Sequence, residues 1–157
     1  MKQSVYIESS VISYLTAKPS RDLIVAAHQQ LTREWWDSAL PKLNAFVSQF
    51  VINEIALGDR EASKARLSVI SNFSQLKMNA EIVDLANRYF KTIHIPEKAK
   101  ADAYHLAMAT WHGIDYLVSW NCTHIASGRV RNIVEHVNSM SNLATPMICT
   151  PEELMEV

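Results

Sequence analysis

The sequence predicts an α/β fold in which a mainly parallel sheet is flanked by helices. Short apolar runs typical of buried strands alternate with longer segments whose apolar residues recur every three or four positions, as on one face of a helix. A helical segment therefore separates each pair of strands, which is the arrangement that parallel pairing requires. No internal repeat, low-complexity tract or linker interrupts this pattern, so we expect a single domain over residues 1–157.

The first half of the chain predicts two strands and three helices. Apolar residues recur at helical spacing after Arg21, and Pro41 interrupts the pattern. Gly58 suits the left-handed residue that ends a helix, and Asp59 can cap the helix that follows. The expected elements are a strand over 5–7, a helix over 21–38, a strand over 45–47, a helix over 49–57 and a helix from 59 to about 73.

The second half of the chain continues the alternation. Asn79 can cap a helix, Pro96 opens the next unit and Gly113 ends it. The segment Thr150–Glu153 is a capping box with proline at the first helical position. The expected elements are a short strand over 76–78, a helix from 79 to about 91, a helix over 98–112, a strand over 116–120, a helix over 129–140 and a strand over 147–149.

The composition is that of an ordinary globular chain. Its 157 residues are 48% hydrophobic, which is enough for one compact core, and its formal net charge is −1. This charge provides no general attraction to nucleic acid, so such binding needs a local basic patch. The first residues lack a signal-peptide pattern, and no apolar stretch approaches the roughly 20 residues that span a bilayer. Cys122 and Cys149 stand apart, as reduced thiols do, and we expect a cytoplasmic protein that contacts no membrane.

Several common sites are excluded because their motifs are missing. The chain has only three glycines and contains neither a dinucleotide-binding glycine loop nor a P-loop, serine nucleophile elbow or HExxH zinc motif. Its six histidines show no zinc-site spacing. His105, three residues after Asp102, can share the helix face of that acid. We interpret it as a partly exposed polar residue or as a donor to a metal ligand, in preference to a metal ligand itself.

Four oxygen-bearing residues converge on one edge of the predicted sheet. Glu8 and Asn121 follow two of the strands, while Glu54 and Asp102 lie in the first turns of two helices. Ligands of parallel α/β sheets bind outside the carboxyl ends of the strands. Taken singly, each residue has an ordinary explanation as a solvated, capping or turn residue, but together they fit one mechanism. Clustered carboxylates repel unless a cation is present, and oxygen ligands favour Mg²⁺ or Mn²⁺, which can activate water for attack on a phosphodiester.

The order of these segments resembles a PIN domain, in particular the VapC-like ribonuclease toxins of type II toxin–antitoxin systems. That family has a first strand ending in an acid and two small polar residues, a second strand entering a Glu-bearing helix, a helix that begins with Asp, and a strand ending in Thr/Ser-x-Asp. Two residues depart from the pattern: Glu8 replaces the usual Asp, and Asn121 stands where the family often has its fourth acid. The matching segments are Glu8-Ser9-Ser10, Ser48–Glu54, Asp102–Ala109 and Asp115–Asn121.

The resemblance implies a three-layer PIN-like fold and a metal-dependent endoribonuclease that acts on RNA. It places Glu8, Glu54 and Asp102 on the metal, with Asn121 bound directly or through water. It also implies a homodimer that a small antitoxin protein inhibits. Because an amide adds no charge, we expect a weaker hold on a second ion than four acids would give. Two alternatives stay open: a PIN-like RNA- or protein-binding module without catalysis, and an unrelated metal-dependent phosphohydrolase.

Neighbouring residues have supporting roles in this prediction. Ser9 and Ser119 can orient the ligands, or only form hydrogen bonds at strand ends. Trp35 is expected in the core, and Trp36 is the better candidate for an exposed contact or a base-stacking surface. Four basic residues are candidates for the substrate phosphate, or else ordinary solvated side chains: Lys98, Lys100, Arg129 and Arg131.

Overall fold

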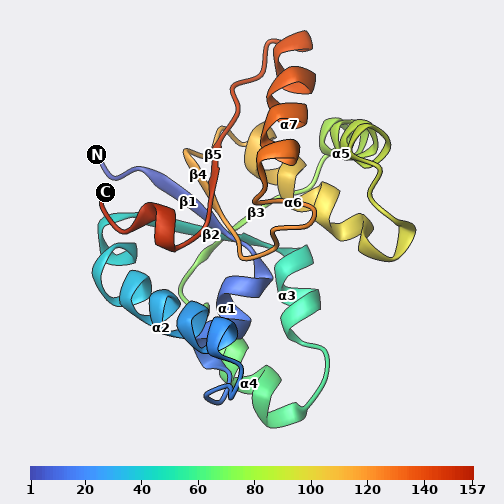
Figure 1. Cartoon of the computed structure of the whole chain (residues 1–157). Helices are drawn as coiled ribbons and strands as arrows, with labels where there is room; N and C mark the ends of the chain where they lie inside the picture. The colour runs from blue at the N-terminus through green and yellow to red at the C-terminus, as the bar shows by residue number, and fades with distance from the viewer.

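The computed structural model describes all 157 residues and contains one five-stranded sheet in which every pairing is parallel. The strand order is β3-β2-β1-β4-β5, so β1 is the central strand (Figure 1). The strands are β1 (Ser4–Ile7), β2 (Asn44–Ser48), β3 (Ser74–Leu76), β4 (Tyr116–Val118) and β5 (Met147–Cys149).

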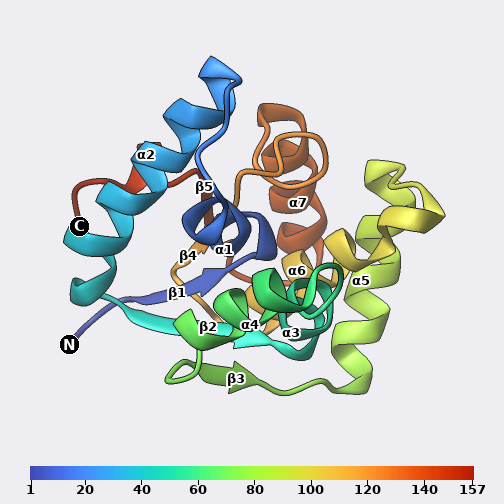
Figure 2. The same ribbon diagram turned by 90° about the horizontal axis from the view of Figure 1, so that it is seen from below.

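Seven α-helices flank the sheet. They are α1 (Ser9–Thr16), α2 (Leu23–Ser38), α3 (Gln49–Ile55), α4 (Arg60–Val69), α5 (Ala80–Ile93), α6 (Lys100–Trp111) and α7 (Gly128–Met140). Figures 1 and 2 show the sheet between two groups of helices, with α5, α6 and α7 on one side and α1, α2 and α4 on the other. This arrangement confirms the predicted α/β class and its three layers. None of the helices has the length and apolar character needed to cross a membrane.

The central strand explains the apolar run that precedes Glu8. Val5, Tyr6 and Ile7 have no exposed surface, because helices cover both faces of the sheet. A parallel strand covered on both sides has a continuous apolar run instead of an alternating one. Glu8 therefore stands at the carboxyl end of the middle strand, which is where ligands of parallel sheets bind.

Local signals in the sequence fix most of the helix ends. Asp59 accepts a hydrogen bond from the N–H of Ala62 (2.9 Å) and caps α4, and Asn79 caps α5 in the same way. Gly58, between α3 and α4, has a φ of +87°, where a residue with a side chain is strained. These observations confirm the predicted caps and the left-handed position.

Helix α1 is the main element that the sequence pattern did not predict. It begins directly after β1, because the side chain of Glu8 accepts the N–H of Ser10 and serves as the cap. Its eight residues are too few to show a clear helical period. Strand β3 also lies two residues earlier than predicted, since this edge strand is polar and mostly exposed. Three elements end earlier than predicted: α3 at Ile55, α4 at Val69 and β4 at Val118.

Candidate metal centre

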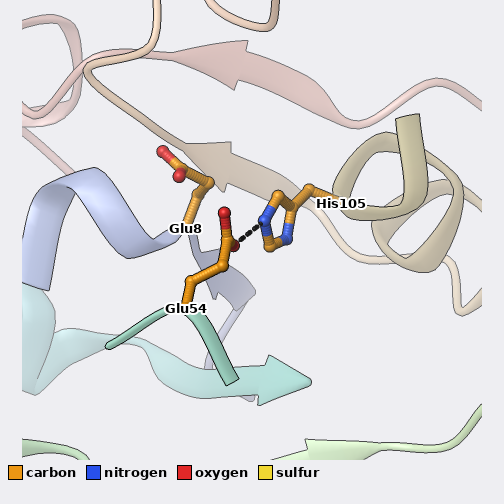
Figure 3. Close-up of side chains that lie close together, drawn as sticks. All are labelled: Glu8, Glu54 and His105. Carbon is orange, nitrogen blue, oxygen red and sulfur yellow. Dashed lines mark hydrogen bonds and ion pairs between the residues drawn. The ribbon is translucent and has the colours of Figure 1, made fainter. Parts of the chain in front are cut away.

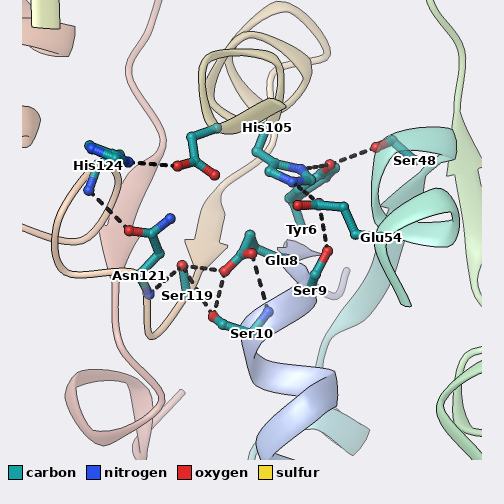
Figure 4. Close-up of polar contacts among 11 residues, drawn as sticks. Tyr6, Glu8, Ser9, Ser10, Ser48, Glu54, His105, Ser119, Asn121 and His124 are labelled. Atoms are coloured by element: carbon teal, nitrogen blue, oxygen red, sulfur yellow. Dashed lines mark hydrogen bonds and ion pairs between the residues drawn. The ribbon is translucent and has the colours of Figure 1, made fainter. Parts of the chain in front are cut away.

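Two strand ends and two helices bring the candidate side chains together. Glu8 follows β1, Ser119 and Asn121 follow β4, and Glu54 lies on α3, which follows β2 directly. Helix α6 contributes Asp102 together with His105, one turn further along the helix. The carboxyl edge of the sheet therefore gathers residues that follow β1 and β4 together with residues on α3 and α6 (Figure 4).

Glu8 is buried and held by three hydrogen bonds. Only 4% of its surface is exposed. Its Oε1 accepts the hydroxyls of Ser10 and Ser119, each at 2.5 Å, and its Oε2 accepts the backbone N–H of Ser10 at 3.1 Å. Such a charge is costly to bury unless polar groups surround it, and these donors hold the carboxylate in one orientation. Glu8 is thus both the cap of α1 and a fixed anion at the centre of the edge.

Glu54 presents one engaged and one free carboxylate oxygen. Its Oε1 accepts the hydroxyl of Ser9 at 2.8 Å and lies 2.5 Å from Nε2 of His105, while the structure records no partner for Oε2. Burial acts to raise the pKa of this carboxyl group. The hydrogen bond and charge of His105 and the bond from Ser9 outweigh burial, so the pKa is lowered from its usual value. Glu54 is therefore an anion with a spare oxygen on a side chain that is 35% exposed.

His105 connects Glu54 to the interior of the protein. It has no exposed surface, which corrects the interpretation of a partly exposed residue, whereas its contact with Glu54 matches the predicted donor role. Its Nδ1 lies 2.7 Å from the hydroxyl of Tyr6, and that hydroxyl lies 2.7 Å from the hydroxyl of Ser48. Burial acts to lower the pKa of His105, but the bond and charge of Glu54, aided by the charges of Glu8 and Asp102, raise it.

Glu8, Glu54 and His105 form one compact group. One ligand atom from each residue lies within 4.8 Å of the others (Figure 3). Two carboxylates face a single imidazole, so the group carries negative charge that a small divalent cation can neutralise. The two acids and the spare oxygen of Glu54 fit such an ion, because carboxylate oxygens are the ligands that Mg²⁺ and Mn²⁺ prefer.

Asp102 and Asn121 lie outside this compact group and share a different partner. The Oδ2 of Asp102 lies 2.8 Å from Nδ1 of His124, and the Oδ1 of Asn121 accepts the backbone N–H of His124 at 3.0 Å. Asn121 is thus a turn residue, which was one of the alternatives that its sequence position allowed. Ser119 links the two groups, since its hydroxyl accepts the N–H of Asn121 at 2.9 Å and donates to Glu8 (Figure 4).

Of the four basic candidates for phosphate binding, the two arginines are hydrogen-bonded within the protein and the two lysines are not. The guanidinium of Arg129 donates to the carbonyl of Ile93 (2.7 Å), and that of Arg131 donates to the carbonyl of Ile148 (2.7 Å) and pairs with Glu153. Both arginines therefore tie α7 to its neighbours. The ammonium group of Lys100 lies 5.2 Å from the centre of the Phe90 ring, and Lys98 is exposed.

The two adjacent tryptophans lie away from the acids. Trp35 has no exposed surface, as expected of a core residue. Trp36 is half-buried, with its ring 5.7 Å from that of Phe73. It lines a hollow of about 500 Å³ together with Asn44 and Ser74, the first residues of β2 and β3. This hollow lies at the amino ends of the strands, on the opposite edge of the sheet from the compact acidic group.

Sequence reasoning missed four residues of this site: Tyr6, Ser10, Ser48 and His124. Tyr6 lies inside an apolar run and gives no sign of a polar role. Ser48 ends β2 as Glu8 follows β1, so its position at a strand end was an available signal. Ser10 lies in the first turn of α1, which the sequence pattern did not predict, and His124 lies in a turn whose geometry no residue spacing reveals.

Comparison with known proteins supports the fold. No family model matches the chain, and no curated protein does. Among solved structures, the chain is similar to VapC20 of Mycobacterium tuberculosis, described as a sarcin–ricin loop cleaving toxin. The similarity has a TM-score of 0.50 and covers 73% of this chain and 87% of that chain, at 15% sequence identity. The chain therefore has a fold similar to that of VapC20, in agreement with the fold that the order of its motifs predicted.

Proposed function

We propose that this VapC-like PIN fold is a metal-dependent endoribonuclease. The observation that carries the proposal is the pairing of Glu8 with Glu54 at the end of the central strand, where ligand atoms of both acids lie within 4.8 Å of each other and of His105. The description of VapC20 as a sarcin–ricin loop cleaving toxin supports RNA as the substrate. We also propose a small antitoxin partner, a homodimer and a cytoplasmic location, which rest on the resemblance of the motifs to VapC-like toxins.

In this proposal Glu8 and Glu54 hold Mg²⁺ or Mn²⁺, and Asp102 and Asn121 complete the site. The structure records no partner for Oδ1 of Asp102, so this oxygen is available while Oδ2 stays with His124. When bound, the ion supplies water activation and charge stabilisation at the phosphodiester. The chain supplies orientation: Ser119 holds Glu8, and hydroxyl and imidazole groups hold Glu54.

In this proposal, RNA phosphates bind to basic side chains that form no hydrogen bond or ion pair within the protein. Lys98 is exposed and Lys100 is engaged only with an aromatic face, so both can meet RNA phosphates near the start of α6. The guanidinium of Arg129 is already bonded to a main-chain carbonyl, and we assign it a smaller share of phosphate binding.

The test is cleavage of single-stranded RNA with Mn²⁺ and with a chelator, repeated for Glu54→Gln and Asp102→Asn. The wild type should cleave RNA only with Mn²⁺, and neither variant should cleave RNA under the same conditions. The matched control is Glu34→Gln, which removes the charge of an exposed carboxylate on α2. Cleavage that persists in the chelator, or that neither site variant reduces, would contradict the proposal. Turnover of small phosphate esters without RNA cleavage would point to a general phosphohydrolase.

A binding module without catalysis is the second candidate, and Asn121 favours it. The amide oxygen of Asn121 already accepts a hydrogen bond in its own turn, and the group adds no negative charge. In that case the wild type binds RNA or a protein without cleaving RNA, and Asn121→Asp switches cleavage on. Measured cleavage by the wild type separates the two candidates directly.

A further inference from the structure

We propose that His105 is a positioning residue that fixes Glu54 for metal binding, and that Tyr6 and Ser48 hold His105 in place. The inference rests on the metal site proposed above. It concerns a chain of four polar side chains that runs from β2 through β1 to α6 and ends at the carboxylate on α3 (Figure 4).

The ring of His105 is fixed at both nitrogens. Nδ1 is bonded to the hydroxyl of Tyr6 at 2.7 Å and Nε2 to Oε1 of Glu54 at 2.5 Å. With both nitrogens engaged and no exposed surface, the imidazole cannot rotate without losing a buried hydrogen bond. An imidazole held in this way presents a fixed donor to Glu54.

The support behind His105 is itself buried. Tyr6 and Ser48 have no exposed surface, and their hydroxyls lie 2.7 Å apart. Apolar side chains at these positions would fill the core without any polar group to satisfy, and buried polar groups are costly unless each one is paired. The chain of hydrogen bonds leaves the core only at Glu54, whose side chain is 35% exposed. The chain of hydrogen bonds therefore fixes the position of the Glu54 carboxylate.

The bond from His105 determines which oxygen of Glu54 faces the ion. His105 and Ser9 both engage Oε1, so the carboxylate is held from one side and Oε2 stays free. A glutamate without this support has several side-chain rotamers on a half-exposed helix face, and a metal must then pay the entropy of ordering them. Partners that orient a ligand in this way typically change metal affinity or activity by about 10- to 100-fold.

Tyr89 provides a matched control for Tyr6. Both tyrosines have no exposed surface, and both hydroxyls make two hydrogen bonds. The hydroxyl of Tyr89 donates to Oδ1 of Asn138 and lies 3.2 Å from the hydroxyl of Thr110, among helices α5, α6 and α7, with no contact to the acids. Replacing either tyrosine by phenylalanine keeps the ring and removes one buried hydroxyl.

The experiment measures Mn²⁺ binding by calorimetry at one pH for the wild type, Tyr6→Phe, Tyr89→Phe, His105→Gln and His105→Leu, after a thermal melt has shown that each variant folds cooperatively. We expect Tyr6→Phe and His105→Leu to bind Mn²⁺ about 10- to 100-fold more weakly. His105→Gln, whose amide can still donate to Glu54, should recover part of that loss, and Tyr89→Phe should bind as the wild type does.

Several outcomes would overturn the inference. Wild-type affinity in Tyr6→Phe, or an equal loss in Tyr6→Phe and Tyr89→Phe, would leave the hydroxyl with a purely structural role. Nitrogen coupling in the pulsed electron paramagnetic resonance spectrum of bound Mn²⁺ that His105→Gln abolishes would make His105 a direct ligand instead. If the wild type itself binds no Mn²⁺, the proposed function fails together with the inference, whereas tight wild-type binding with unaffected variants refutes the inference alone.

Discussion

Ser119→Ala tests how the hydroxyl at the end of β4 stabilises the acidic edge. Ser119 has no exposed surface, donates to Glu8 at 2.5 Å and accepts the N–H of Asn121 at 2.9 Å. The substitution removes a hydrogen bond to a charged group, which is worth about 1.5–3 kcal/mol, and leaves the Asn121 N–H without this partner. For a chain of this size, 1 kcal/mol shifts Tm by about 2–4 °C, so we expect Tm to fall by about 3–12 °C.

The assay is thermal and urea denaturation of the metal-free protein, with a chelator present. The matched control is Ser139→Ala, because that exposed serine donates to the carbonyl of His136 at 2.8 Å and should change stability by no more than about 0.5 kcal/mol. The variant should also bind Mn²⁺ more weakly, since Glu8 loses an orienting donor. A Ser119→Ala protein that melts with the wild type and with Ser139→Ala would refute the assignment of this hydroxyl to Glu8.

Three further predictions follow from particular side chains. Glu8→Asp withdraws the carboxylate from two serine hydroxyls, so it should lower the urea midpoint of the metal-free protein by more than Ser119→Ala does. Asn121→Asp should lower the Tm of the metal-free protein through repulsion but raise Mn²⁺ affinity by roughly tenfold, which is a gain of about 1.4 kcal/mol, and calorimetry with and without the ion checks both signs. Burial, and then the charge of Glu153, raise the pKa of Cys149 to about 12, so an alkylating reagent should modify only the exposed Cys122 in the folded protein. Because unfolding lets the Cys149 thiol ionise at its usual pKa, stability should fall as the pH rises above about 9, and melts across that range measure this.

The part of the site that depends on strand ends could be predicted from the sequence. Glu8 stands after an uninterrupted apolar run, and a charge in that place marks the carboxyl end of a buried strand. Glu54 was placed correctly for a related reason, because its helix follows a strand without a loop. The sheet and most helices followed from the same periodic signals, while α1 was missed because its eight residues are too few to show a helical period.

The part that depends on side-chain direction could not be predicted. The spacing of Asp102 and His105 places them on one helix face, but the structure turns the imidazole toward Glu54 and pairs the carboxylate with His124. Tyr6 looks like an ordinary core residue in the sequence, and only the position of His105 in three dimensions gives its hydroxyl a partner. Such pairings depend on how α6 packs beside the sheet, which no local pattern encodes.

The most direct test of the proposed metal site is the anomalous scattering of a crystal of the wild-type protein soaked with Mn²⁺. We predict a peak between the carboxylates of Glu8 and Glu54, on the side of the free Oε2 of Glu54 and within reach of Asp102. A fully soaked crystal that shows no peak there, or a peak coordinated only by residues outside this edge of the sheet, would contradict the proposed site.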